Sequence, residues 1–209
     1  MIPMVPSTAP ARAIGWAAIV AVAGLVLGVG TQTLQGVLPD DWGVLANSGA
    51  VWAIGAFALG AILPDVRTAA IGGAIELVIA SCSFYAAVDM FEHVGANPRS
   101  TVIWSGAGIV AGSVFGAAGY VARRSAVWRD PAWAFVAGAL AAEGAYLTRQ
   151  LGITTLRPAG VVELLLAGAI FVGSMLRTRR RALVATLFLA TCLVTLTSYR
   201  LINVIFART

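Results

Sequence analysis

The sequence predicts an all-α, polytopic membrane protein, and three observations lead to this fold class. Hydrophobic residues make up 59% of the 209 residues and charged residues only 11%, whereas soluble domains carry roughly 25% charged residues. Apolar runs of about 20 residues recur along the chain, which is the length a helix needs to cross a bilayer. These runs lack the alternation of a transmembrane β-barrel. We therefore expect residues 1–209 to form a single transmembrane bundle whose main surroundings are lipid.

About seven transmembrane helices are expected, separated by short polar loops. Pro131 and Pro158 favour helix starts, because the first turn of a helix tolerates proline, and Pro64 favours a helix end. The first apolar run is long and no A-x-A site follows it, so we expect a retained span rather than a cleaved signal peptide. The expected spans are 12–31, 43–63, 66–90, 100–121, 131–150, 158–176 and 182–206.

Arginine placement predicts the orientation of these spans. All 14 basic residues are arginine, and cytoplasmic loops carry the excess of positive charge in membrane proteins. With seven spans, the face that includes "RTRRR" at 177–181 holds nine arginines and the opposite face holds five. We therefore expect a multi-pass protein of the bacterial cytoplasmic membrane, with its amino terminus inside.

The same composition argues against several functional classes. The net charge is +5, but the basic residues that produce it lie between apolar spans. No nucleic-acid partner is therefore expected. Without lysine, the chain cannot form a retinal Schiff base. The only histidine, His93, falls in a loop, and neither a zinc-protease motif nor a phosphate-binding loop is present. Cys82 and Cys192 lie within apolar spans and are expected to pack as small hydrophobes. We expect no enzymatic activity, no cofactor and no metal.

Glycines repeat at every fourth position in two of the spans. Gly108, Gly112 and Gly116 form one stripe of a helix, and Gly24 and Gly28 form another. Such stripes allow the backbones of two helices to approach closely. Two interpretations remain open: packing within the chain, or a docking face for a protein partner or a second copy.

Three glutamates are expected at membrane depth, where an ionisable group is costly by about 2.5–3.5 kcal/mol. At 1.5 Å per helical residue, Glu76 lies roughly 13 Å and Glu143 roughly 18 Å from the inner ends of their spans. Glu163 lies roughly 8 Å below the outer surface by the same rise. We expect Glu143 to face the bundle interior, because lipid offers it no hydrogen-bond donor.

A charged cluster is expected in the outer half of the bundle. Arg149 is expected to pair with Glu163 rather than with Glu143, because six residues along a helix point to a different face. Opposite charges would offset each other's desolvation there. The members of this cluster would be Arg149, Glu163 and Arg200, with Asp89, Tyr85, Tyr146, Tyr199 and His93 at its margin.

Three interpretations of these charges compete. The first is a set of structural ion pairs, and the second is a polar cavity for a small ligand or ion, lined by Glu76 and Glu143 between the third, fifth, sixth and seventh spans. The third is a proton relay through one glutamate. The polar run "TCLVTLTSYR" at 191–200 favours a wet or ligand-lined path. If Glu143 is such a site, Glu143→Gln is expected to keep the fold.

Three stretches together resemble a family of small, uncharacterised bacterial membrane proteins of the actinobacterial type: "LANSGAVW" at 45–52, "AGSVFGAAGYVARR" at 111–124 and "AEGAYL" at 142–147. The resemblance covers most of residues 15–205. It implies a helical membrane fold but no activity, and it draws attention to Asn47, Trp52, Glu143 and Tyr146. The chain is more distantly similar to the substrate-binding components of energy-coupling vitamin transporters, which have six spans.

The function expected from these features is binding or transport of a small molecule or ion through a polar site within the bundle. The alternative is a non-catalytic accessory subunit that docks onto a membrane complex through its glycine stripes. The candidate ligand or ion site comprises Glu76, Glu143, Tyr146, Arg149, Glu163 and Arg200.

Overall fold

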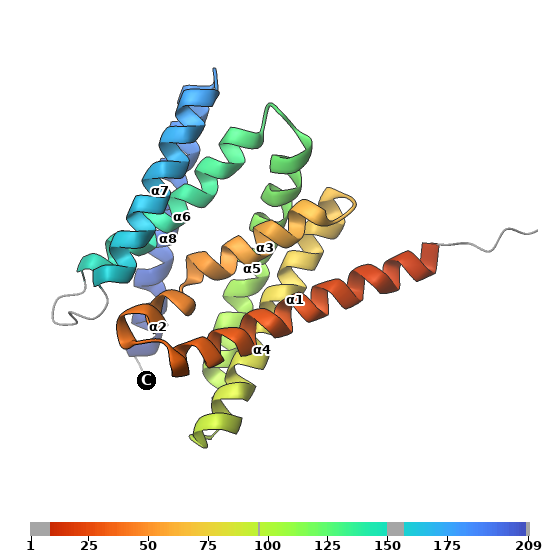
Figure 1. Ribbon diagram of the computed structural model, residues 1–209, viewed down its shortest axis with the longest axis vertical. Helices are drawn as coiled ribbons and strands as arrows, with labels where there is room; N and C mark the ends of the chain where they lie inside the picture. Colours follow the sequence, from red (N-terminus) through yellow and green to blue (C-terminus); the bar gives the residue numbers. More distant parts are fainter. Residues whose placement is uncertain (1–8, 96, 150–156, 208–209) are drawn as a thin grey trace, which may run out of the picture.

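The computed structural model describes residues 9–95, 97–149 and 157–207. Within these ranges the chain forms helices joined by short turns and loops, and it contains no strand. Figure 1 shows the arrangement, with α6, α7 and α8 side by side at one end of the molecule and α1 extending outward at the other. The helices are α1 (Ala9–Val37), α2 (Asp40–Ala46), α3 (Gly49–Ile62), α4 (Val66–Glu92), α5 (Pro98–Arg124), α6 (Arg129–Arg149), α7 (Arg157–Arg177) and α8 (Arg181–Ala207).

Six stretches of the described chain are long and apolar enough to cross a membrane, which agrees with a multi-pass membrane protein. They correspond to the expected spans except for the fifth, α6, which does not belong to this set. α6 is instead the innermost helix, with 13 of its 21 residues buried. A helix that is surrounded by other helices can carry more polar residues than one that faces lipid, and this explains its weaker apolar signal.

The second expected span is divided into two helices, contrary to the single helix expected over 43–63. α2 ends at Ala46, and α3 begins at Gly49. Between them, Ser48 adopts an extended conformation and its hydroxyl accepts a hydrogen bond from the backbone N–H of Val51 at 3.2 Å. This side-chain cap replaces a helical hydrogen bond, so a new helix starts inside the span.

Close glycine contacts bring the backbone of α4 into direct contact with those of α1 and α5. A Cβ atom on Gly112 would lie 2.2 Å from the carbonyl oxygen of Gly73, and one on Gly116 would lie 2.2 Å from that of Ala69. Gly28 approaches the carbonyl oxygen of Ala80 equally closely. Both stripes noted in the sequence therefore pack within the chain, and Gly108, Gly112 and Gly116 are all buried.

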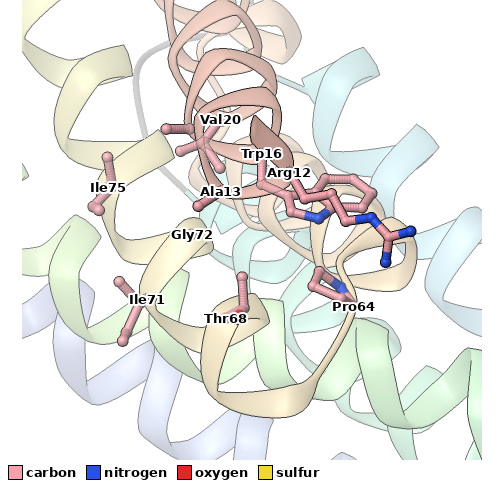
Figure 2. Close-up of a pocket in the computed structure, with 10 residues that line it drawn as sticks. Arg12, Ala13, Trp16, Val20, Pro64, Thr68, Ile71, Gly72 and Ile75 are labelled. Carbon is pink, nitrogen blue, oxygen red and sulfur yellow. The ribbon is translucent and has the colours of Figure 1, made fainter. Parts of the chain in front are cut away.

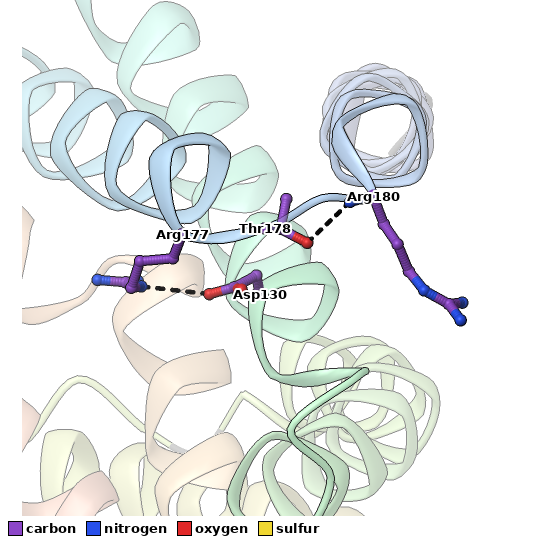
Figure 3. A network of polar contacts seen from close by, with 4 residues as sticks. All are labelled: Asp130, Arg177, Thr178 and Arg180. Carbon is purple, nitrogen blue, oxygen red and sulfur yellow. Dashed lines mark hydrogen bonds and ion pairs between the residues drawn. The ribbon is translucent and has the colours of Figure 1, made fainter.

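α3 packs mainly against α5 and α4 and so belongs with α1, α4 and α5 to a first group, whereas α6, α7 and α8 form a second group in which α6 packs against both α7 and α8. An ion pair between Arg177 and Asp130, with Nε and Oδ1 3.3 Å apart, fastens the end of α7 to the start of α6. Figure 3 shows this pair beside the turn where the Arg180 N–H donates to the Thr178 hydroxyl at 3.1 Å. The Arg180 side chain points away from the pair and is exposed.

Candidate functional site

Glu143 of α6 lies in the bundle interior, as expected, and its carboxylate is held at the start of α3. The hydroxyl of Ser48 donates to Oε2 at 3.0 Å, and the backbone N–H of Gly49 donates to Oε1 at 3.0 Å. The backbone N–H of Ala50 also donates to Oε2. The side chain is only 5% exposed. Three donors thus replace the water that the carboxylate would otherwise bind.

The break between α2 and α3 creates this binding position. The first N–H groups of a helix have no partner within the helix, and the helix dipole makes its amino terminus favourable for negative charge. Because α3 starts inside the span, its free N–H groups and positive end lie in the interior. Glu143 occupies the position that discontinuous helices of transporters offer to anionic substrate groups.

Glu163 of α7 is the second carboxyl group at this site. Its side chain is completely buried, and neither oxygen has a hydrogen-bond partner within the described part of the chain. It lies close enough to Glu143 for electrostatic repulsion and is also beside Ser48. Two buried carboxyl groups on neighbouring helices therefore face one point near the start of α3.

A close glycine contact explains why the two carboxyl groups meet. A Cβ on Gly144 would lie 2.7 Å from the carbonyl oxygen of Gly160, and one on Gly160 would lie 2.8 Å from that of Gly144. The backbones of α6 and α7 therefore touch directly next to Glu143 and one turn from Glu163. This glycine pair was not expected from the sequence, although small residues of this kind signal close helix packing.

Tyr199 of α8 completes the site from the opposite side. A Cβ on Gly49 would lie 2.8 Å from the Tyr199 hydroxyl and 3.7 Å from Glu143 Oε2. Gly49 therefore leaves the space in which the hydroxyl and the carboxylate meet. The Tyr199 ring stacks on that of Tyr146 with centroids 4.8 Å apart, and Asn203 donates to the Tyr146 hydroxyl at 2.9 Å.

The expected partners of the glutamates are elsewhere. Arg149 and Arg200 are exposed, and among the described residues the ion pair found is that of Arg177 with Asp130. The expected pairing of Arg149 with Glu163 is therefore wrong. Long arginine side chains near helix ends can extend toward water, so they need not follow a buried carboxyl group inward.

The other side chains expected at the margin of the cluster are also separate from it. His93 is exposed and ends α4 in a left-handed conformation, and Tyr85 packs edge-on against Phe84. Asp89 is half-buried and accepts the backbone N–H of His93 through its carbonyl oxygen. Of the expected cluster, Glu163, Tyr146 and Tyr199 do come together, and they do so around Glu143 and Ser48.

Glu76 is buried at a different place. Its side chain is 3% exposed, and Oε2 has no hydrogen-bond partner among the described residues. Oε1 would be 3.5 Å from a Cβ on Gly55, and Gly55 lies six residues along α3 from Gly49, roughly 9 Å at the helical rise. Glu76 and Glu143 therefore do not share one site.

A cavity of about 590 Å³ lies between α3, α4, α5, α6 and α8, and its position differs from the expected one. Neither Glu76 nor Glu143 lines it. Its wall is mainly apolar and aromatic, but the polar run of α8 contributes to it as the sequence suggested. Gly49 and Tyr199 belong to both this wall and the carboxyl site. The hydroxyl-bearing residues of the wall are Ser81, Thr191, Thr195, Ser198 and Tyr199.

A second cavity, of about 610 Å³, lies between α1 and the start of α4. Figure 2 shows Trp16 and Val20 of α1 above Ile71 and Gly72 of α4, with the Arg12 guanidinium extending past Pro64. None of the glutamates lines this cavity. Its wall is apolar apart from Arg12 and Thr68, so it offers no polar site comparable to the start of α3.

The site contains carboxyl and hydroxyl groups but no cluster typical of a transition metal. Among the described residues, no three His, Cys, Asp or Glu side chains come together in a way that could hold a metal ion. The arrangement instead gathers two carboxyl groups and the hydroxyls of Ser48 and Tyr199, which are all oxygen groups that favour a positive charge.

Comparison with known proteins agrees with one part of the resemblance noted in the sequence, namely that the chain belongs to a family without an assigned activity. No curated protein and no solved structure matches the chain. A family model matches residues 7–205, which is nearly the whole chain and includes every helix that contributes to the carboxyl site. The protein therefore belongs to DUF6518, a family of unknown function.

Proposed function

We propose that the protein binds or transports a cation, either an ion or a small positively charged molecule, at the Glu143–Glu163 pair. Glu163 carries this proposal: it is fully buried, and neither carboxyl oxygen forms a hydrogen bond within the described chain, because the neighbouring Ser48 hydroxyl donates to Glu143 instead. Buried polar groups are normally satisfied by hydrogen bonds. An exception beside a second carboxylate therefore supports a site whose missing partner is a ligand.

Charge balance favours a positive ligand. Glu143 is already matched by three donors and by the positive end of α3. Glu163 has no such partner, and the electrostatic effect of Glu143 on it is repulsive. An uncompensated buried charge is strongly unfavourable, so a proton or another cation between the two carboxyl groups would relieve both the desolvation and the repulsion.

The membrane arrangement proposed for this site keeps seven spans, with α6 as the buried fifth, in a bacterial cytoplasmic membrane. The amino terminus would be cytoplasmic, since nine arginines against five then lie on the inner side. The Glu143–Glu163 pair would lie in the outer half. Labelling a single cysteine near Thr209 in intact cells tests this arrangement, and protection from a membrane-impermeant reagent would contradict it.

Cation-dependent stability tests the site itself. The thermal unfolding of the purified protein is measured at constant ionic strength in sodium, potassium and tetramethylammonium chloride, and over a range of pH. A cation that binds the native state raises the melting temperature by mass action. The groups that face Glu163, namely Glu143, Ser48 and Tyr199, stay unchanged in the comparison of wild type with Glu163→Gln.

We expect the melting temperature of the wild type to depend on the cation present and on pH. Glu163→Gln is expected to abolish this dependence. Glu92→Gln is the matched control, because Glu92 is exposed at the end of α4 and far from the site in the chain. If wild type and Glu163→Gln respond identically to every cation and to pH, the pair holds no exchangeable positive charge and the proposed function is wrong.

A further inference from the structure

We propose that the ligand is a lipophilic organic cation, whose apolar body occupies the cavity between α5 and α8 and whose charge is stabilised by Glu163 and Glu143 from behind Gly49 and Tyr199. This inference rests on the proposed function and specifies its ligand class. The ligand class follows from the size and the apolar wall of the cavity, which a site for a bare ion at the carboxyl pair would not need.

The cavity suits an apolar molecule of moderate size. Its volume of about 590 Å³ falls within the range of roughly 300–1,000 Å³ that is typical of small-molecule sites. Five aromatic side chains from four helices line it: Trp52, Trp104, Phe115, Phe135 and Tyr199. Such faces favour both apolar contact and a nearby positive charge. A bare inorganic ion would gain little from this wall, because the wall is mainly apolar and the hydroxyls of Ser81, Thr191 and Ser198 already donate to backbone carbonyls.

Neither Glu143 nor Glu163 lines this cavity, but the carboxyl pair lies directly behind two residues of its wall. Gly49 and Tyr199 line the wall, and the Tyr199 hydroxyl lies next to Glu143 at the position that a Cβ of residue 49 would occupy. Glu163 also acts electrostatically on Tyr199. None of the described wall residues is basic. The cavity therefore combines an apolar body with a negative end, which complements a cation and disfavours an anion of the same shape.

The cavity opens sideways, between helices, rather than only toward an aqueous surface. Val110 and Val114 of α5 and Val194 and Leu201 of α8 belong to its wall and are exposed on the outside of the molecule. In a bilayer, these side chains face acyl chains. A lipophilic cation that has partitioned into the membrane can thus reach the cavity between α5 and α8 without crossing the helix bundle.

Ions of equal shape and opposite charge provide the test. Binding of tetraphenylphosphonium, tetraphenylborate and tetramethylammonium to the full-length protein in lipid nanodiscs is measured at equilibrium, with empty nanodiscs subtracted. We expect tetraphenylphosphonium to bind at least roughly tenfold more tightly than either of the other two. Equal binding of the two tetraphenyl ions would show that charge plays no part, and this would overturn the inference.

Two substitutions on α8 test the cavity with a matched pair. Ala190 lines the wall, whereas Ala182 lies on the same helix outside it, and both are exposed. Ala190→Phe is expected to weaken tetraphenylphosphonium binding by roughly tenfold or more, and Ala182→Phe to leave it unchanged. If both or neither of the substitutions weakened binding, the cavity would not be the binding place.

Glu163→Gln separates this inference from the proposed function. Loss of tetraphenylphosphonium binding in this variant supports both. If the stabilising effect of tetramethylammonium or sodium depends on Glu163 but tetraphenylphosphonium does not bind, the proposed carboxyl site is retained and the proposed lipophilic ligand is wrong. If tetraphenylphosphonium binds equally to wild type and Glu163→Gln, the charge is not stabilised by Glu163 and the inference fails. If Glu163→Gln does not fold, the relative binding of tetraphenylphosphonium and tetraphenylborate to the wild type still tests the inference.

Discussion

The amino termini of α3 and α4 are stabilised by carboxylates in two different ways. At α4, Asp65 accepts hydrogen bonds from the backbone N–H of Thr68 at 2.8 Å and from the Thr68 hydroxyl at 2.6 Å. This cap is local in the chain and exposed to solvent. At α3, the carboxylate comes from Glu143, more than 90 residues later, and it is buried.

The difference decides what each carboxylate does for the molecule. If Asp65 is removed, water can hydrogen-bond to the exposed N–H groups of α4. Water cannot easily replace Glu143, because the start of α3 lies inside the bundle. The Glu143 contact also joins α6 to α3, and hence the two groups of helices to each other. An exposed cap thus stabilises one helix, whereas the buried cap stabilises the arrangement of helices around the proposed cation site.

The largest effect is expected for Glu143→Ala. The substitution leaves the Ser48 hydroxyl and the N–H groups of Gly49 and Ala50 without their acceptor. An unsatisfied buried polar group costs about 1–3 kcal/mol, so a loss on the order of 3–6 kcal/mol in unfolding free energy is expected. Thermal unfolding in detergent measures the loss, and hydrogen exchange locates it at the start of α3. A melting temperature close to that of wild type would show that α3 does not depend on this cap.

The neutral variants of the two glutamates are expected to change stability in opposite directions. All three contacts of Glu143 are donors, so the amide nitrogen in Glu143→Gln would face N–H or O–H groups. We expect it to lose about 1–3 kcal/mol, whereas the sequence alone led us to expect that the variant keeps its fold if Glu143 is a ligand or proton site. Glu163 has no donors in the described chain and is repelled by Glu143, so Glu163→Gln is expected to match or exceed the wild-type melting temperature without ligand. If Glu143→Gln and Glu163→Gln lowered the melting temperature equally, Glu143 would not be the cap of α3 and Glu163 would not be an unsatisfied carboxyl group.

The contrast between the two caps also explains which parts of the molecule could be predicted from the sequence. Helix α4 was expected over 66–90 and spans Val66–Glu92, because its boundaries depend on neighbouring residues and on apolar content. The break before α3 was missed, although Asn47, Ser48 and Gly49 are typical of turns. The apolar residues on both sides favour one continuous span, and the acceptor that stabilises the break comes from another helix.

The candidate site follows the same division. The interior position of Glu143 could be predicted, because a carboxylate in lipid lacks donors. Its partners could not be predicted, since backbone N–H groups leave no signature in the sequence. The expected pairing of Arg149 with Glu163 relied on similar depths, but depth does not fix which side chains meet. The Gly144–Gly160 contact brings Glu143 close to Glu163, and the space at Gly49 lets the Tyr199 hydroxyl approach Glu143.

Ser48→Ala is expected to have an intermediate effect, because Ser48 takes part in both a local and a distant cap. Its hydroxyl accepts from the Val51 N–H and donates to Glu143. Loss of a serine cap typically costs about 1 kcal/mol, and two donors of Glu143 remain. Ser48→Thr retains the hydroxyl and serves as the control. If Ser48→Ala destabilised the protein as much as Glu143→Ala, the hydroxyl rather than the backbone donors would hold the carboxylate.

The smallest effect is expected at Asp65, whose cap is local and fully exposed. Asp65→Ala should lower the melting temperature less than Ser48→Ala does, and Asp65→Asn should lower it less still, because an amide oxygen can also accept the Thr68 N–H. The hydrogen bonds from Thr68 lower the pKa of Asp65 below its ordinary value. A carboxyl group with a lowered pKa in the folded state stabilises the fold above its unfolded pKa, and this contribution is lost as the pH falls through the folded value. The difference between wild type and Asp65→Ala should therefore be constant near neutral pH and shrink below about pH 4. Thermal unfolding of the two proteins across that range measures it, and a difference that grew on acidification would have the wrong sign for this cap.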